Sequence, residues 1–191
     1  MLLSSRVLRG AVGPRGLALL ALALCPSHVF AAEPTLCKAD ELVVFSCSTG
    51  ARIASVCASK DISKTGGFMQ YRFGRTDGVE LAFPDPGAKP ADVFTSGTLM
   101  FSGGGGAWLR FGKGPFSYTI FTAIGKWGRS GSPADVAGVA VAKDGEEFAN
   151  FPCRKAGVAA SELGPDFFEK IGLKASDSAA DFEIPDAFFP K

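Results

Sequence analysis

Apolar and polar residues alternate along much of the chain between Glu41 and Phe151. From Met69 to Phe73 every second residue is apolar, and the same holds from Val79 to Phe83. A period of two is the pattern of a β-strand with one buried face and one face in water. The sequence predicts eight or nine such strands, over 41–47, 52–58, 69–73, 79–83, 97–102, 107–111, 116–124, 136–142 and 146–151.

Short turn sequences separate these strands and pair them into hairpins. Four of them, each containing glycine, stand at 48–50, 75–78, 112–115 and 143–145. Turns of this composition join antiparallel neighbours. Segment 84–90 holds three prolines and excludes a central strand, because proline cannot donate to the hydrogen-bond ladder. We therefore predict an all-β fold, an antiparallel eight- or nine-stranded barrel or sandwich.

The alternation ends at Cys153, and the composition of 154–191 is different. This tail predicts one short C-terminal helix, with Pro165 at its first position and its aromatic residues on one face. We expect the core to end at Cys153, so that a chain ending near Ala160 still unfolds cooperatively. The helix is expected to pack on the outside of the β domain. A tail that binds a partner, or one that stays disordered, is the alternative.

The first part of the chain, 1–31, has the layout of a secretory signal peptide. Three arginines and no acidic residue precede an apolar run of ten residues at 16–25, and Ala31 is a small residue for cleavage. A membrane anchor needs about 20 apolar residues. A lipoprotein needs a small residue before Cys25, where this chain has leucine. We predict export to the periplasm or beyond the cell, with 32–153 as the β domain.

Removal of the signal peptide changes the chemistry available to the chain. The one histidine, His28, lies within it, so the exported form has none. This excludes Ser-His-Asp triads, Cys-His pairs and histidine-ligated metals. The remaining net charge is near −2, which argues against nucleic acid as a partner. We expect a monomeric binding protein, not an enzyme, with no cofactor and no metal. A hydrolase that uses paired carboxylates is an alternative.

Four cysteines remain after the signal peptide: Cys37, Cys47, Cys57 and Cys153. Three pairings are possible. With a tight turn in the first hairpin, Cys57 lies opposite the start of the first strand and close to Cys37, while Cys47 lies at the far end. We therefore predict the disulfides Cys37–Cys57 and Cys47–Cys153. The rival set, Cys37–Cys153 with Cys47–Cys57, needs a different hairpin. No CxxC motif is present, so the cysteines are expected to be structural.

The most unusual segment is a run of four glycines at 103–106, flanked by Ser102, Trp108 and Arg110. Such a run costs stability, because glycine loses the most conformational entropy on folding. One interpretation is a bend or bulge where the strand changes direction. The other is a binding loop that lets a second backbone approach and presents these side chains together with Lys113. A second loop, at 125–133, is the other candidate contact segment.

The order of the motifs resembles that of bacterial periplasmic inhibitors of c-type lysozyme. That family carries an F-x-C-x-x-G strand, an S-G-S-G-A-x-Y segment, a Lys-Gly element and a closing cysteine. Here the matching segments are 45–50, 102–108, 113–114 and Cys153, with a longer glycine run and Trp in place of Tyr. The resemblance implies that Ser102 and Lys113 enter the lysozyme cleft and oppose its paired carboxylates. A structural or assembly factor of the cell envelope is the alternative.

Overall fold

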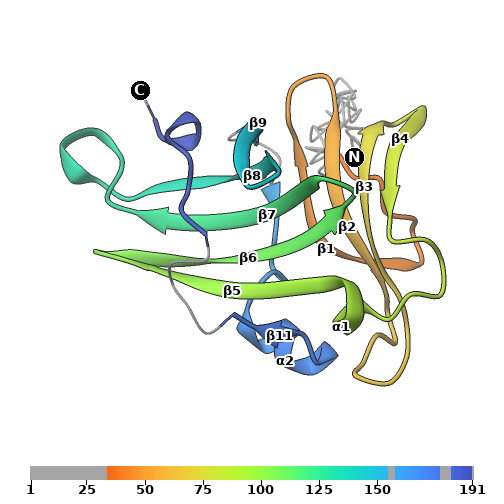
Figure 1. Cartoon of the computed structure of the whole chain (residues 1–191). Helices are drawn as coiled ribbons and strands as arrows, with labels where there is room; N and C mark the ends of the chain where they lie inside the picture. The colour runs from red at the N-terminus through yellow and green to blue at the C-terminus, as the bar shows by residue number, and fades with distance from the viewer. Residues whose placement is uncertain (1–33, 155–157, 177–181, 191) are drawn as a thin grey trace, which may run out of the picture. The chain divides into compact units, whose positions relative to one another are not determined.

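The structure, a computed structural model, describes residues 34–154, 158–176 and 182–190, and it is dominated by β-strands (Figure 1). The predicted signal peptide lies outside the described residues. The strands are β1 (Glu41–Ser48), β2 (Ile53–Ser59), β3 (Met69–Arg75), β4 (Gly78–Phe83), β5 (Phe94–Phe101), β6 (Gly104–Lys113), β7 (Phe116–Gly125), β8 (Ala134–Lys143), β9 (Glu146–Pro152), β10 (Val158–Ala159) and β11 (Lys174–Ala175). Two α-helices, α1 (Pro90–Val93) and α2 (Pro165–Ile171), and the 3-10 turns η1 (Arg129–Gly131) and η3 (Asp186–Phe188) complete the described elements.

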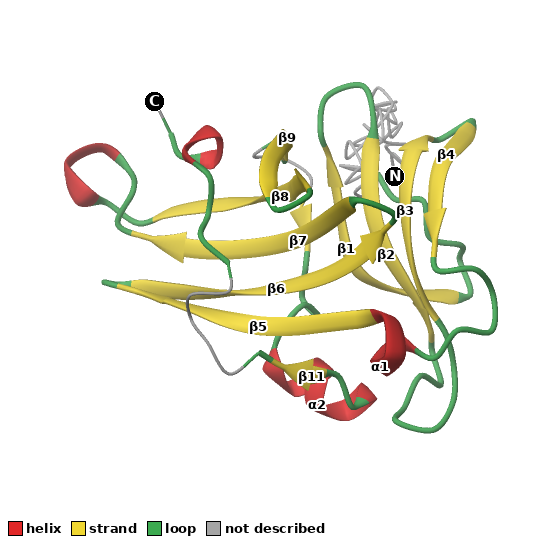
Figure 2. Ribbon diagram, viewed as in Figure 1, coloured by secondary structure: helices red, strands yellow, loops and turns green. Residues whose placement is uncertain are grey.

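The strands form two sheets, which Figure 2 shows in yellow. The five-stranded sheet has the order β10-β1-β2-β3-β4, and the six-stranded sheet has the order β11-β5-β6-β7-β8-β9. All neighbours are antiparallel except β11 and β5. The chain passes from one sheet to the other through the proline-rich segment and α1, where no ladder strand was expected. The predicted all-β antiparallel fold is therefore confirmed, in its sandwich form.

Aromatic side chains join the inner faces of the two sheets. Tyr71 of β3 lies 5.1 Å from Phe111 of β6 between ring centroids, and Phe83 of β4 stacks on the same Phe111 ring at 4.9 Å. Phe73 lies 5.2 Å from Phe151 of β9. Such pairs add to the area that the rings remove from water. The main core cluster therefore contains residues of both sheets.

The outer face of the six-stranded sheet is also covered. Along β6, Leu109 faces the main core while its neighbour Trp108 belongs to a second cluster. The C-terminal segment 182–190 supplies Phe182 and Phe188 to this cluster, and both contact Phe121 of β7. In Figure 1 this segment is dark blue and crosses β7 and β8. The sheet is thus buried on both faces over part of its length.

Burial continues beyond Cys153, where the sequence analysis placed the end of the core. The helix α2 forms as predicted, with Pro165 in its first turn, and ends at Gly172, whose φ of 70° is left-handed. Its apolar residues Phe167, Phe168 and Ile171 belong to the main core cluster. The helix therefore supplies part of the core that the two sheets share.

Both predicted disulfides are present, Cys37–Cys57 and Cys47–Cys153, with Cα–Cα distances of 5.3 Å and 5.6 Å. The register differs slightly from the expected one, because the turn is longer. Cys57 pairs with Val43, next to the bulge between Val43 and Phe45. Cys47 pairs with Ala54, close to the turn, which keeps it far from Cys57. Disulfides of this kind persist in oxidising compartments.

Candidate functional site

The four residues expected to bind a partner do not form one site. Ser102 lies in the turn before β6, Trp108 and Arg110 lie within that strand, and Lys113 ends it. At about 3.3 Å per residue, Ser102 and Lys113 are roughly 30 Å or more apart along the strand. A single concave surface that joins all four side chains is therefore not formed.

Trp108 and Arg110 hold the C-terminal segment on the outer face of the six-stranded sheet. Trp108 is only 2% exposed, and its indole lies directly over Gly97, where a side chain would collide with it. The guanidinium carbon of Arg110 lies 4.8 Å from the Trp108 ring centroid and 5.8 Å from that of Phe182. Its Nε donates to Thr119 Oγ1 at 2.8 Å. In this arrangement both side chains pack within the protein.

The glycine run allows β6 and β7 to approach closely. A Cβ added at Gly104 would collide with the carbonyl oxygen of Ile124, and one at Gly106 with that of Thr122. At Gly105 it would lie 2.8 Å from the carbonyl oxygen of Leu99 in β5. The expected bend or bulge is not found at Gly104–Gly106, because these residues pair with the neighbouring strands without a register shift. The glycines instead let backbones within the fold approach closely.

Beside this run, two loops meet at one end of the six-stranded sheet (left in Figure 1). We call this end the tip and define it as the β5–β6 turn at 102–103 and the β7–β8 loop at 126–133. The Lys126 side chain crosses Gly103, where an added Cβ would lie 2.7 Å from the lysine Cε. Gly103 has a φ of 78°, a conformation that suits glycine. The tip thus places the Lys126 side chain over Gly103, the residue that follows Ser102.

Aromatic side chains pack against one another at the tip. Trp127 lies over Gly125 and contacts Phe101 of β5 at 5.0 Å and Phe189 of the C-terminal segment at 5.1 Å. On the opposite face of the sheet, Met100 is 89% exposed and Ile124 is 42% exposed. Exposed apolar groups therefore lie near the tip on one face of the sheet, and the rings of Phe101, Trp127 and Phe189 pack on the other.

Lys126 was missed by the sequence analysis, although a signal for it existed. Lys113 pairs with Phe116, and this register continues without a shift to Gly105 and Ile124. Extending it by two residues places 103 opposite 126. The predicted turn at 112–115 fixed that register, so the neighbour of Ser102 could have been found by counting along the hairpin.

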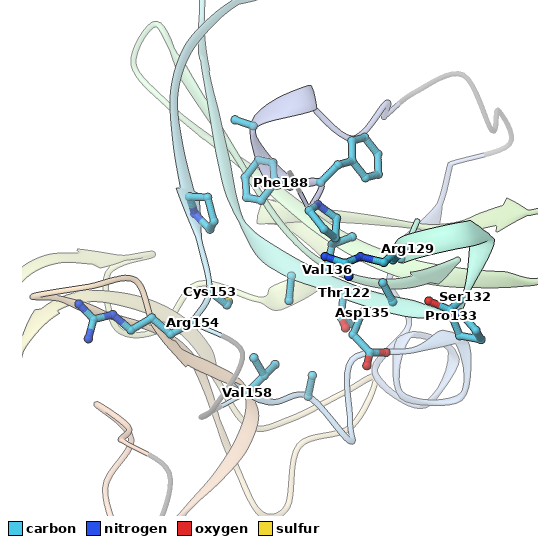
Figure 3. Close-up of a pocket in the computed structure, with 18 residues that line it drawn as sticks. Thr122, Arg129, Ser132, Pro133, Asp135, Val136, Cys153, Arg154, Val158 and Phe188 are labelled. Atoms are coloured by element: carbon cyan, nitrogen blue, oxygen red, sulfur yellow. The ribbon is translucent and has the colours of Figure 1, made fainter. Parts of the chain in front are cut away.

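An open groove of 1130 Å³ borders the tip loop and the start of β8 (Figure 3). Its charged lining residues are Arg129, Asp135 and Arg154. Asp135 is the single carboxylate among the described residues that line the groove. Hydrolysis of a glycosidic bond ordinarily needs a pair of carboxylates about 5 to 9 Å apart. The described lining of this groove does not supply such a pair.

Among the described residues, one group has potential metal-ligand atoms close together, Cys37, Glu41 and Cys57. Its two cysteines form a disulfide, and its carboxylate is engaged by Arg72. A disulfide sulfur is not the thiolate that binds a metal. The described helices are all too short to span a membrane.

Comparison of the chain with protein-family models, with curated proteins and with solved structures finds no match. The resemblance to the lysozyme inhibitors therefore remains a prediction that rests on the short motifs of the sequence.

Proposed function

We propose that this chain is an exported, non-enzymatic, monomeric binding protein that inserts its tip into an acidic cleft of a partner. The partner class that fits the motifs is a cell-wall hydrolase of the lysozyme type. The observation that carries the proposal is the position of the Lys126 side chain over Gly103, the residue that follows Ser102 in the same turn. The two disulfides support action in the periplasm or outside the cell.

The chemistry of such a cleft matches the groups at the tip. Glycosidases of this class have two carboxylates flanking the scissile bond. An ammonium placed between them makes charge-assisted hydrogen bonds, which are stronger than neutral ones. The hydroxyl of Ser102 can donate to the same carboxylates. The turn that carries Ser102 also contains Gly103, which has no side chain, so this turn is narrow.

The proposal assigns the lysine differently from the sequence resemblance. Resemblance points to Lys113, which lies at the opposite end of β6 from Ser102. Geometry favours Lys126, since one partner cleft can reach it together with Ser102. Each lysine can be tested separately, because Lys113 and Lys126 lie at opposite ends of the six-stranded sheet.

The test is inhibition of c-type lysozyme acting on bacterial cell walls. Ser102→Ala and Lys126→Met should each weaken inhibition about tenfold or more, because each leaves a charged partner group unpaired in the complex. Methionine keeps the apolar stem of the lysine over Gly103. Lys170→Met, at an exposed position of α2, is the matched control and should not change inhibition.

Two outcomes would contradict this proposal. Absence of inhibition at micromolar concentration would remove lysozyme as the partner. Loss of inhibition in Lys113→Met, with full inhibition in Lys126→Met, would support the sequence motif and reject the tip as the contact surface.

A further inference from the structure

A second candidate site lies at the other end of the six-stranded sheet, where Lys113 is located. A pocket of 220 Å³ opens there between the two sheets. Tyr71 and Phe73 line it from the five-stranded sheet, and Phe116, Tyr118, Phe148 and Phe151 line it from the six-stranded sheet. We call it the aromatic pocket. None of its described lining residues carries a charge.

The pocket is apolar and large enough for a small ligand. Burial raises the pKa of the Tyr71 hydroxyl far above its ordinary value of 10, so this side chain stays neutral. Apolar cavities of about 150 Å³ take up benzene and stay free of water. The volume here corresponds to about seven groups of roughly 30 Å³ each, the size of a water molecule and close to that of a methylene. An aliphatic chain of about seven or eight carbons would fill it.

The mouth of the pocket exposes an aromatic side chain. Phe148 is 61% exposed, and its ring lies 5.2 Å from that of Phe116 in an edge-to-face contact. This residue occupies the bulge that interrupts the pairing of β8 with β9. A ligand chain in the pocket would cover the ring and remove its apolar area from water, which is favourable.

Two lysines stand beside this mouth. In the sheet register Lys113 and Lys143 both pair with Phe116, one from each side. The Nζ of Lys113 lies 5.7 Å from the Phe83 ring centroid, and that of Lys143 lies 5.9 Å from the Phe116 ring centroid. Glu146 pairs with Lys143 in the register, but the ion pairs of the described residues join other side chains. Lys113 and Lys143 are therefore the cationic groups beside the mouth, with the carboxylate of Glu146 opposite Lys143 on the neighbouring strand.

We propose that the aromatic pocket binds a free medium-chain carboxylate of about eight carbons. Its aliphatic chain lies among the aromatic rings, and its carboxylate lies between Lys113 and Lys143. The site is independent of the proposed function, since the tip lies at the opposite end of β6. Octanoate binding without lysozyme inhibition would leave this proposal intact, and the reverse result would leave the tip intact.

The first experiment measures the affinity of the full exported chain for hexanoate, octanoate, decanoate and dodecanoate by calorimetry. Each added methylene that enters the pocket should raise affinity about fourfold. The gain should stop near octanoate, where the cavity is full. Affinity that does not depend on chain length would overturn the proposal.

The second experiment blocks the pocket. Ala149 also lines it, so Ala149→Leu should lower octanoate affinity at least tenfold. The matched control is Ala82→Leu, at an exposed position of β4 in the five-stranded sheet, which should bind octanoate as the unchanged chain does. Phe148→Ser gives a second test at an exposed position, and it should also weaken binding. Unchanged octanoate binding in both pocket variants would overturn the proposal.

The third experiment tests the charge and the source of the ligand. Lys113→Gln and Lys143→Gln should each weaken octanoate binding about fivefold and leave octanol binding unchanged. Octylamine should bind more weakly than octanoate. Equal binding of the amine and the carboxylate would reject the lysine pair. Binding to vesicles of anionic phospholipid without binding to free octanoate would replace this ligand with a membrane surface.

Discussion

At the residue scale, one buried ion pair shows what alternation along a strand can and cannot reveal. Arg72 lies on the face of β3 that the sequence predicts to be wet, yet it is only 8% exposed. Its Nη1 and Nη2 donate to the two carboxylate oxygens of Glu41 at 2.6 Å and 2.8 Å. Nη1 also donates to the carbonyl of Leu36 at 2.9 Å. The segment before β1 therefore covers this face, which strand periodicity alone cannot predict.

This pair predicts how stability depends on pH. Burial raises the pKa of Glu41, but hydrogen bonds from Arg72 and from the Lys38 backbone N–H outweigh it, so the pKa lies below its ordinary value of 4.5. The folded state then holds its proton less tightly than the unfolded state does. The pair contributes stability above pH 4.5, and this contribution is lost as pH falls through the lower, folded pKa.

Glu41→Gln should therefore destabilise the protein by about 3 kcal/mol at pH 7, because Arg72 keeps a buried charge without its partner. The difference from the unchanged chain should shrink toward pH 3, as measured by denaturant unfolding at each pH. Glu80→Gln is the control, since the Arg52–Glu80 pair is exposed and should contribute about 0.5 kcal/mol or less. A difference that is the same at pH 7 and pH 3 would contradict this assignment.

At the element scale, β6 shows how a packing requirement overrides local preference. The sequence predicted a strand only from Ala107, with the glycines outside it. The strand in fact begins at Gly104, because Gly104, Gly105 and Gly106 pair in register with β5, and the last two also pair with β7. Glycine has a weak preference for strands, so only the close approach of neighbouring backbones explains their place in the ladder.

Gly104→Ala and Gly106→Ala should each destabilise the protein by about 1 to 3 kcal/mol, the cost of forcing extra atoms into a packed region. Gly112→Ala, in the same strand, is the matched control. Its added Cβ would lie 3.9 Å from the carbonyl oxygen of Phe116, an ordinary van der Waals contact, and should change stability by about 0.5 kcal/mol or less. Thermal unfolding of the three variants measures this. Equal midpoints would mean that packing does not require the glycine run.

At the scale of the whole molecule, local signals were enough for β1 to β9, their hairpins and the two disulfides, whereas β10 and β11 were not predicted. The hairpin turns fixed which strands pair, and the pairing of the first two strands brought Cys37 to Cys57. Two features depend on contacts between distant segments and were not predictable in this way. One is the cover that Phe182 and Phe188 provide on the outer sheet face, and the other is the entry of α2 into the main core.

The C-terminal segment and α2 predict different effects of shortening the chain. A chain ending at Ser176 loses the buried Phe182, Ile184 and Phe188, which uncovers one outer face but leaves the main core and both disulfides complete. Each lost side chain costs about 1.5 to 3 kcal/mol of burial. This chain should still unfold in one cooperative transition, at a lower temperature.

A chain ending at Ala160 should behave differently, contrary to the expectation from the sequence. It also loses Leu163, the buried face of α2 and Leu173, which belong to the cluster shared by both sheets. The inner faces would then be open along one side, and the remaining burial is too small to offset the entropy of ordering the strands. Calorimetry should show no cooperative transition, and a dye that binds exposed apolar surface should bind it strongly. A sharp transition in this shorter chain would show that the strands and their disulfides alone form a sufficient core, and that α2 adds only cover.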